Sequence, residues 1–123
     1  MVDSDSNGIT FCQGNFVAMW ADIPAAIHRF SDRICFVHFR DVDGGSDSFV
    51  ECWHDDGPTN MLAAMNAYDE FVDDRVPMRP DHVPTMAGEN NTNPDYHMLG
   101  SLLTCGYVRG RSECVQTSRI SIS

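Results

Sequence analysis

Three short runs of apolar residues recur along the chain, and each is followed by a polar loop and then by apolar residues at helical spacing. The runs cover residues 8–12, 34–39 and 76–79. Successive strand, loop and helix units of this kind predict a parallel sheet with right-handed crossovers. Three units cannot close a (β/α)8 barrel, which takes about 250 residues. The sequence therefore predicts an α/β fold, either a small open domain or a piece of a larger barrel.

Residues that favour helix N-termini mark where the helices begin. Asp22 precedes Pro24, which predicts a capping side chain followed by proline in the first turn. Thr59 or Asn60 is expected to cap the second helix. Pro94 is expected to start the third helix.

Two segments show no clear periodicity. Residues 43–58 form a long connection, and long connections in compact domains are usually functional or disordered. Residues 111–123 are mainly polar and show little periodicity except at Ile120 and Ile122. We therefore expect residues 1–110 to form one α/β domain, either an open domain or a partial barrel, and residues 111–123 to form a disordered tail.

The charge balance bears on partners and location. The net charge is −10 at pH 7, and none of the basic residues is lysine, so no nucleic-acid partner is expected. An aspartate-rich composition without lysine resembles proteins of halophilic microbes, where salt screens carboxylate repulsion. A merely acidic protein is the alternative. The chain has no apolar run of about 18 residues and no secretory leader, so we expect a cytoplasmic protein with no membrane partner.

Each predicted strand leads to a residue that can bind a metal. Cys12 ends the first strand, His38 lies at the end of the second, and Asp81 follows the third after Pro80. Functional groups collect at the carboxyl ends of parallel strands, so we expect these three side chains to share one metal site. The mixture of donors suits Mn²⁺, Fe²⁺, Co²⁺ or Zn²⁺ better than Mg²⁺ or Ca²⁺. The alternative is that Cys12 and His38 are ordinary core residues.

Further polar residues near the strand ends are candidate catalytic or substrate-binding groups. His82 stands beside Asp81, and its imidazole can carry a proton near neutral pH; a surface dipeptide is the alternative. Tyr96 is expected at the start of the last helix, where its phenol either reaches the site or packs. Arginine suits a carboxylate because it can hold it by two hydrogen bonds. The candidate substrate contacts are Arg40, Glu51, His54 and Arg79.

Several separate segments resemble the mannonate dehydratase family, in the same order along the chain. They are FCQGNF (11–16), FVHFRDV (36–42), FVECWHDDGPTNMLAAMNAY (49–68), PMRPDH (77–82), YHMLG (96–100) and GYVRG (106–110). The resemblance is to the C-terminal part of that family and covers about residues 8–110. HFRDV, HDDG and RPDH are its most specific parts. We expect the likeness to end beyond residue 110.

The resemblance implies the last three βα units of a TIM barrel of the xylose isomerase-like type, with Mn²⁺ or Fe²⁺ as cofactor. It implies Cys12, His38 and Asp81 as metal ligands, and His82 and Tyr96 as the catalytic proton-transfer pair. The implied reaction is the dehydration of D-mannonate to 2-keto-3-deoxy-D-gluconate in hexuronate breakdown. The family has a further histidine ligand on an earlier strand without a counterpart here, so a truncated form is expected.

Two alternatives stay open beside a truncated dehydratase. The first is a non-catalytic fragment that folds with a complementary chain or as a homo-oligomer, since an open three-strand piece exposes two sheet edges. The second is a metal-dependent sugar isomerase on the same type of barrel, which rests on fold analogy alone.

Overall fold

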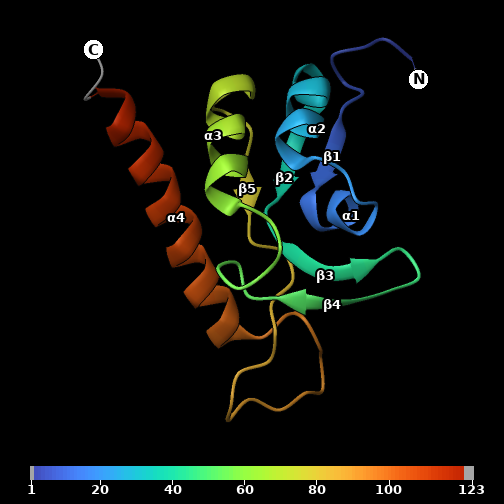
Figure 1. Ribbon diagram of the computed structural model, residues 1–123, viewed down its shortest axis with the longest axis vertical. Helices are drawn as coiled ribbons and strands as arrows, with labels where there is room; N and C mark the ends of the chain where they lie inside the picture. Colours follow the sequence, from blue (N-terminus) through green and yellow to red (C-terminus); the bar gives the residue numbers. More distant parts are fainter. Residues whose placement is uncertain (1, 121–123) are drawn as a thin grey trace.

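The computed structural model describes residues 2–120, and Figure 1 shows their arrangement. At the centre is a three-stranded parallel sheet in the order β1–β2–β5. Its strands are β1 (Ile9–Cys12), β2 (Ile34–His38) and β5 (Met78–Arg79). Because helices alternate with these parallel strands, the predicted α/β class is confirmed.

Two helices begin at the capping residues that the sequence predicts. Asp22 accepts a hydrogen bond from Ala25 N at 3.0 Å, and Asn60 accepts one from Ala63 N at 3.0 Å. Each cap satisfies a backbone N–H group that has no partner within its helix. Of the two predicted caps for the second helix, Asn60 is therefore the one used. The helices are α1 (Gln13–Ala18), α2 (Ile23–Phe30), the 3₁₀ turn η1 (Ser31–Arg33), α3 (Met61–Phe71) and α4 (Met98–Ile120).

Helices α2 and α3 lie side by side against the sheet, and α4 runs along α3 (Figure 1). Phe11 of β1 and Val37 of β2 belong to the core between these layers and are almost completely buried. Burial of apolar surface stabilises such a core by about 25 cal/mol per Å². The core consists of Phe11, Ile23, Ile27, Ile34, Val37, Phe39, Met61, Ala64, Met65, Ala67, Tyr68 and Val115.

The other face of the sheet is more open. Side chains alternate between the two faces of a strand, so the neighbours of Phe11 and Val37 point away from the helices. Thr10 pairs with Phe36, and Cys12 pairs with His38. Thr10 is exposed and the other three are partly exposed. The ligand-capable Cys12 and His38 therefore share the open face.

A β-hairpin occupies much of the segment predicted as a long loop. Strands β3 (Asp41–Gly45) and β4 (Ser48–Cys52) pair in antiparallel register. Gly44 is required there, since its φ is +123° and a Cβ would lie 2.4 Å from Ser48 O. The Asp, Gly and Ser residues of this segment favour turns, which is why the sequence did not indicate a strand. The hairpin projects beyond the carboxyl ends of β1 and β2 (Figure 1).

Helix α4 differs from the predicted one at both ends. It starts at Met98 rather than Pro94, and it continues to Ile120, through the position predicted as a domain boundary. Val115 is 5% exposed and lies in the core, so the end of this helix packs on the core through Val115 and is not a disordered tail. Val115 follows Val108 by two helical turns, a signal too sparse among polar neighbours to predict a helix. Residues 121–123 lie outside the described residues.

Among residues 2–120, no helix combines the length and the apolar character that crossing a membrane requires.

Candidate metal centre and acid–base cluster

Three side chains that could hold a metal ion converge at the carboxyl end of the sheet. Cys12 and His38 are direct partners in the β1–β2 register, and His38 is the partner of Arg79 in β5. Asp81 follows just beyond Arg79. One ligand atom from each of Cys12, His38 and Asp81 lies within 4.8 Å of the others. Protein ligands lie about 2.0–2.3 Å from a bound transition metal, so two ligand atoms of one ion are at most about 4.6 Å apart. Small side-chain adjustments would therefore bring these three donors to one ion.

The backbone of Asp81 adopts a conformation that is uncommon for a residue with a side chain. Its φ is +63°, in the left-handed region, where a non-glycine residue is strained. The side chain is 4% exposed and forms an ion pair with Arg79. Asp81 Oδ2 also lies 3.3 Å from His38 Nδ1 and 3.4 Å from Arg40 Nε. These contacts hold the carboxylate toward the sheet and offset the strain.

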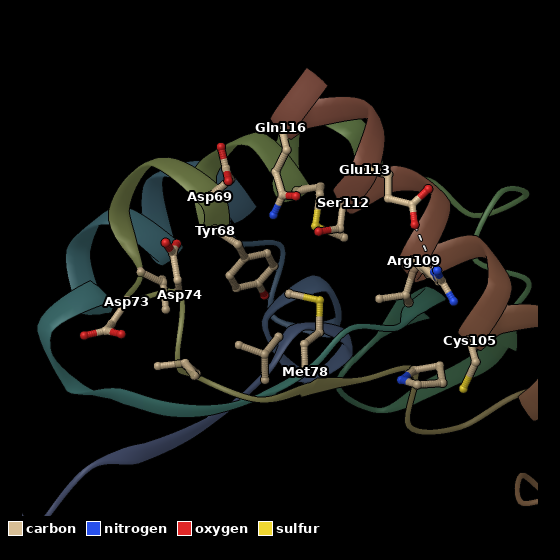
Figure 2. A pocket seen from close by; sticks show the side chains of 16 residues that line it. Tyr68, Asp69, Asp73, Asp74, Met78, Cys105, Arg109, Ser112, Glu113 and Gln116 are labelled. Carbon is tan, nitrogen blue, oxygen red and sulfur yellow. Dashed lines mark hydrogen bonds and ion pairs between the residues drawn. The ribbon is translucent and has the colours of Figure 1, made fainter. Parts of the chain in front are cut away.

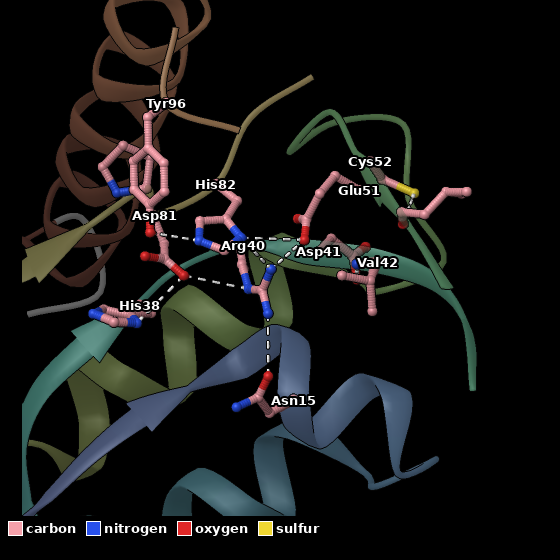
Figure 3. A network of polar contacts seen from close by, with 12 residues as sticks. Asn15, His38, Arg40, Asp41, Val42, Glu51, Cys52, Asp81, His82 and Tyr96 are labelled. Atoms are coloured by element: carbon pink, nitrogen blue, oxygen red, sulfur yellow. Dashed lines mark hydrogen bonds and ion pairs between the residues drawn. The ribbon is translucent and has the colours of Figure 1, made fainter. Parts of the chain in front are cut away.

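Arg40 is the centre of the charged network shown in Figure 3. Its side chain is 6% exposed, and Nη1 donates a hydrogen bond to Glu51 Oε1. Nη1 also lies 2.9 Å from His82 Nδ1, while Nη2 donates to Asn15 Oδ1 at 3.1 Å. Gly14 leaves room for the guanidinium, because a Cβ there would lie 2.7 Å from Arg40 Nε. Arg40 therefore joins α1, β4 and the loop that follows β5.

His82 and Tyr96 form a pair on the loop between β5 and α4. His82 Nε2 lies 2.7 Å from the Tyr96 hydroxyl oxygen. The backbone N–H of Val83 donates to Asp95 O at 3.1 Å, which ties the two ends of the loop together beside the pair. Tyr96 is 52% exposed, so a molecule in solution can reach its phenol.

The protonation state of His38 suits a metal ligand. Burial lowers the pKa of His38, although the nearby Asp81 carboxylate acts in the opposite direction. A lowered pKa favours the neutral imidazole, which is the form that binds metal ions.

The structure separates the predicted substrate contacts into two groups. The Arg79 side chain is 46% exposed, so part of it is open to solvent beside its ion pair with Asp81. Arg40 and Glu51 are instead buried against each other, with exposed side-chain fractions of 6% and 12%. The guanidinium of Arg40 is thus already bound by protein groups.

His54 does not reach the open side of the cluster. It is 1% exposed, and its Nε2 contacts the carbonyl oxygens of Phe39 and Pro80, the latter at 3.1 Å. Burial lowers the pKa of His54, opposed by these two carbonyl groups. The neutral ring therefore donates a hydrogen bond from Nε2 and links the chain just after β2 to the chain just after β5. This position differs from the predicted substrate contact.

Two residues of the cluster's surroundings were not singled out in the sequence. Asn15 positions Arg40, and its only signal was its place in the FCQGNF segment, one helical turn after Cys12. Asp41 is fully buried and accepts hydrogen bonds from Thr59 N at 2.8 Å and Thr59 Oγ1 at 2.6 Å. It thereby ties the hairpin to the start of α3.

A separate groove lies between α3, α4 and the sheet (Figure 2). Its volume is about 380 Å³, and its lining includes Tyr68, Asp69, Asp73, Arg109 and Glu113 but none of the three residues of the candidate metal site. Burial raises the pKa of Tyr68. The groove is therefore distinct from the charged cluster at the strand ends.

The sequence matches a family model described as D-mannonate dehydratase (UxuA) over residues 1–121. The match extends past residue 110, where we expected the likeness to end. The chain is similar to mannonate dehydratase 1 of Agrobacterium fabrum, with 34% identity over 99% of this chain and 34% of that protein. It is also similar to the mannonate dehydratase of Saccharophagus degradans, with 36% identity over 89% of this chain and 31% of that protein.

The structure is similar to the crystal structure of mannonate dehydratase from Streptococcus suis serotype 2. The TM-score is 0.85 at 28% sequence identity, and the match covers 96% of this chain and 35% of that chain. The chain thus spans about a third of the length of the curated relatives and of the solved structure that it matches.

Proposed function

Because the chain belongs to the D-mannonate dehydratase family, we propose that it carries metal-binding and proton-transfer groups of an enzyme that dehydrates D-mannonate to 2-keto-3-deoxy-D-gluconate. This reaction removes a proton at C2 and the hydroxyl group at C3, so one group must accept a proton and another must donate one. The observation that carries the proposal is the convergence of Cys12, His38 and Asp81 beside the His82–Tyr96 pair.

The open face of the sheet supports a place in a (β/α)8 barrel of the xylose isomerase-like type. In such barrels one face of each strand points into the interior, and the other packs against the outer helices. Here α2 and α3 cover the face of Phe11 and Val37, while Cys12 and His38 lie on the other face. We infer that this open face is one wall of the barrel interior, with the site at the carboxyl end where barrel enzymes place it.

The donor set fits a divalent ion of the Mn²⁺ or Fe²⁺ class. A thiolate, an imidazole and a carboxylate together favour transition metals over Mg²⁺ and Ca²⁺, and the lowered pKa of His38 favours its ligating form. Cys12, His38 and Asp81 would hold the ion. When bound, the ion supplies a Lewis acid that stabilises negative charge on a substrate oxygen and so makes the C2 proton easier to remove.

His82 and Tyr96 would move the two protons. Their polar atoms are 2.7 Å apart, so a proton can pass directly between them. His82 is bonded to Asp81 along the chain, which places the proton carrier next to the ligand cluster. The exposed Arg79 would bind the carboxylate of the sugar acid, because a guanidinium can hold both carboxylate oxygens.

Metal binding by the purified chain tests the proposal directly. Mn²⁺ is titrated calorimetrically into the wild-type chain and into the variants Cys12→Ala, His38→Ala and Asp81→Asn. His28→Asn is the matched control, because His28 is exposed and its ring contacts Phe71 rather than the cluster. We expect the wild-type chain and the His28→Asn control to bind Mn²⁺, and each of the other three variants to lose this binding. Equal binding by all variants would overturn the proposed metal site.

A second candidate function is a non-catalytic chain that binds the metal but needs a complementary chain for turnover. The exposed and partly exposed residues on the open face of the sheet favour it, because a further chain could cover them. Keto-acid production from D-mannonate with Mn²⁺, at low and at high salt, separates the two candidates. The enzyme is supported if the wild-type chain turns over D-mannonate and the His82→Asn variant still binds metal but has no turnover. Metal binding without turnover supports the non-catalytic chain.

A further inference from the structure

The Nδ1 atom of His82 faces an arginine, and this limits where the ring can carry its proton. Arg40 Nη1 lies 2.9 Å from His82 Nδ1. A guanidinium has N–H donors and no acceptor, and it stays protonated in proteins. In the neutral ring Nδ1 must therefore be the acceptor, and the ring hydrogen must be on Nε2.

The same constraint sets the direction of the hydrogen bond between His82 and Tyr96. If Nε2 carries the ring hydrogen, it donates to the phenolic oxygen at 2.7 Å. The hydroxyl hydrogen of Tyr96 must then point away from the imidazole. The neutral pair thus offers the Tyr96 hydroxyl as a donor to a third molecule, while His82 supports the phenolic oxygen.

Glu51 is the competing partner for Nδ1. Its Oε1 lies 3.4 Å from His82 Nδ1, farther than Arg40 Nη1. Glu51 Oε1 also accepts a hydrogen bond from Arg40 Nη1 itself, and Asn15 holds the other terminal nitrogen of the guanidinium. Arg40 is therefore oriented from two sides, and Glu51 acts on His82 mainly through Arg40.

We propose that Arg40 is a positioning residue that fixes the Nε2–H tautomer of His82. The inference names the residue that orients the proton-transfer pair. The use of Arg40 in catalysis rests on the proposed function. A positive charge near Asp81 is not sufficient for this role. Arg79 is also a cation beside Asp81, but its described hydrogen bond and ion pair go to Asp81 rather than to His82.

Long-range ¹H–¹⁵N correlation spectra of the histidine-labelled chain read the tautomer without metal or substrate. The measurement is made at about pH 8, above the ordinary histidine pKa of about 6.5, and His82→Asn identifies the His82 signals. We expect a protonated Nε2 and an unprotonated Nδ1. A protonated Nδ1 in the wild-type chain overturns the proposal.

Variants show whether Arg40 is the cause. Arg40→Met should shift both ring nitrogens toward the averaged values of an imidazole that exchanges tautomers, and Asn15→Ala should shift them less. Arg79→Met removes the same charge near Asp81 and should leave the His82 pattern unchanged, and His28 serves as the internal reference. Asn15 is exposed, so its variant gives an answer if Arg40→Met does not fold.

A His82 pattern in Arg40→Met that matches the wild type, or an effect of Arg79→Met equal to that of Arg40→Met, overturns the role of Arg40. If Arg40→Met does not fold, an Asn15→Ala spectrum identical to that of the wild type overturns it. The metal titration is a separate measurement. If the wild-type chain binds no metal but His82 keeps the Nε2–H tautomer, only the proposed function is overturned. If the chain binds metal but His82 carries its hydrogen on Nδ1, only this inference is overturned.

Discussion

Two arginine–glutamate ion pairs, one buried and one exposed, lie in different regions of the molecule. Arg40 and Glu51, in the charged cluster, have side chains that are 6% and 12% exposed. Arg109 and Glu113, on α4 beside the groove, pair at 2.9 Å with side chains that are 83% and 64% exposed. Water and salt screen the pair on α4, whereas burial strengthens the electrostatic interaction in the cluster. The same two residue types therefore belong to a buried charged network in one region and form an exposed surface pair in the other.

The contrast extends to the surroundings of each pair. The cluster joins side chains from α1, β4 and the loop after β5 through one guanidinium, as Figure 3 shows. The groove in Figure 2 is hollow and acidic, but its helix α4 is held by apolar packing such as that of Val115. A hollow surface alone therefore does not identify the site; converging charged groups on neighbouring strands do.

The largest effect is expected when the buried pair is broken. Arg40→Met leaves the carboxylates of Glu51 and Asp81 without their shared cation, and breaking a buried pair costs about 3–5 kcal/mol. Urea denaturation measures the loss. Arg79→Met is the control, since the Arg79 side chain is 46% exposed and Asp81 keeps Arg40. A loss for Arg79→Met as large as that for Arg40→Met would contradict the distinction between the two arginines.

The groove side should depend on apolar burial rather than on charge. Val115→Ala removes two methyl groups from a side chain that is 5% exposed, so we expect a loss of about 2 kcal/mol in the free energy of unfolding. Cys114→Ala, on an exposed position of the same turn, should change stability little. If the two variants behaved alike, Val115 would not be packed as described.

A pH-dependent contribution is expected from His54 under the cluster. Burial lowers its pKa in the folded state below the ordinary value of 6.5, so the folded protein binds this proton less readily than the unfolded chain. The stability linked to His54 is complete above about pH 6.5 and is lost as the pH falls toward the folded-state pKa.

Urea midpoints at several pH values between neutral and mildly acidic conditions measure this contribution. His54→Gln should lose less stability on acidification than the wild type, and His28→Gln should follow the wild type because His28 is exposed. Identical acid sensitivity of His54→Gln and the wild type would show that His54 does not contribute.

The smallest effect is expected for the exposed pair on α4. Arg109→Ala should leave the urea midpoint within experimental error of the wild type at moderate salt, because exposed ion pairs are screened and weak. Glu113→Gln should behave in the same way. A clear loss in either variant, comparable with that of Arg40→Met, would remove the contrast between the two regions.

The parts of the fold that were predictable rest on local patterns. Asp22 and Asn60 cap helices because a short polar side chain before an apolar helical face is sufficient to do so. The strand ends also followed from local patterns, and parallel pairing then brings Cys12 and His38 to the same level of the sheet. The hairpin was missed because its polar turn-forming residues become a strand only through pairing with β4.

By itself, the sequence determined the order of the three parallel strands and of the helices α2, α3 and α4 that follow them, the acidic charge, the family and the residues able to bind a metal. The tertiary structure alone decided how alike residues were used. Arg40 and Arg79 both lie at the carboxyl end of a parallel strand, yet Arg40 is buried among Asn15, Glu51 and His82, whereas Arg79 lies open beside Asp81. The physical reason is that burial and hydrogen-bond partners come from elements distant in the chain, which a local pattern does not encode.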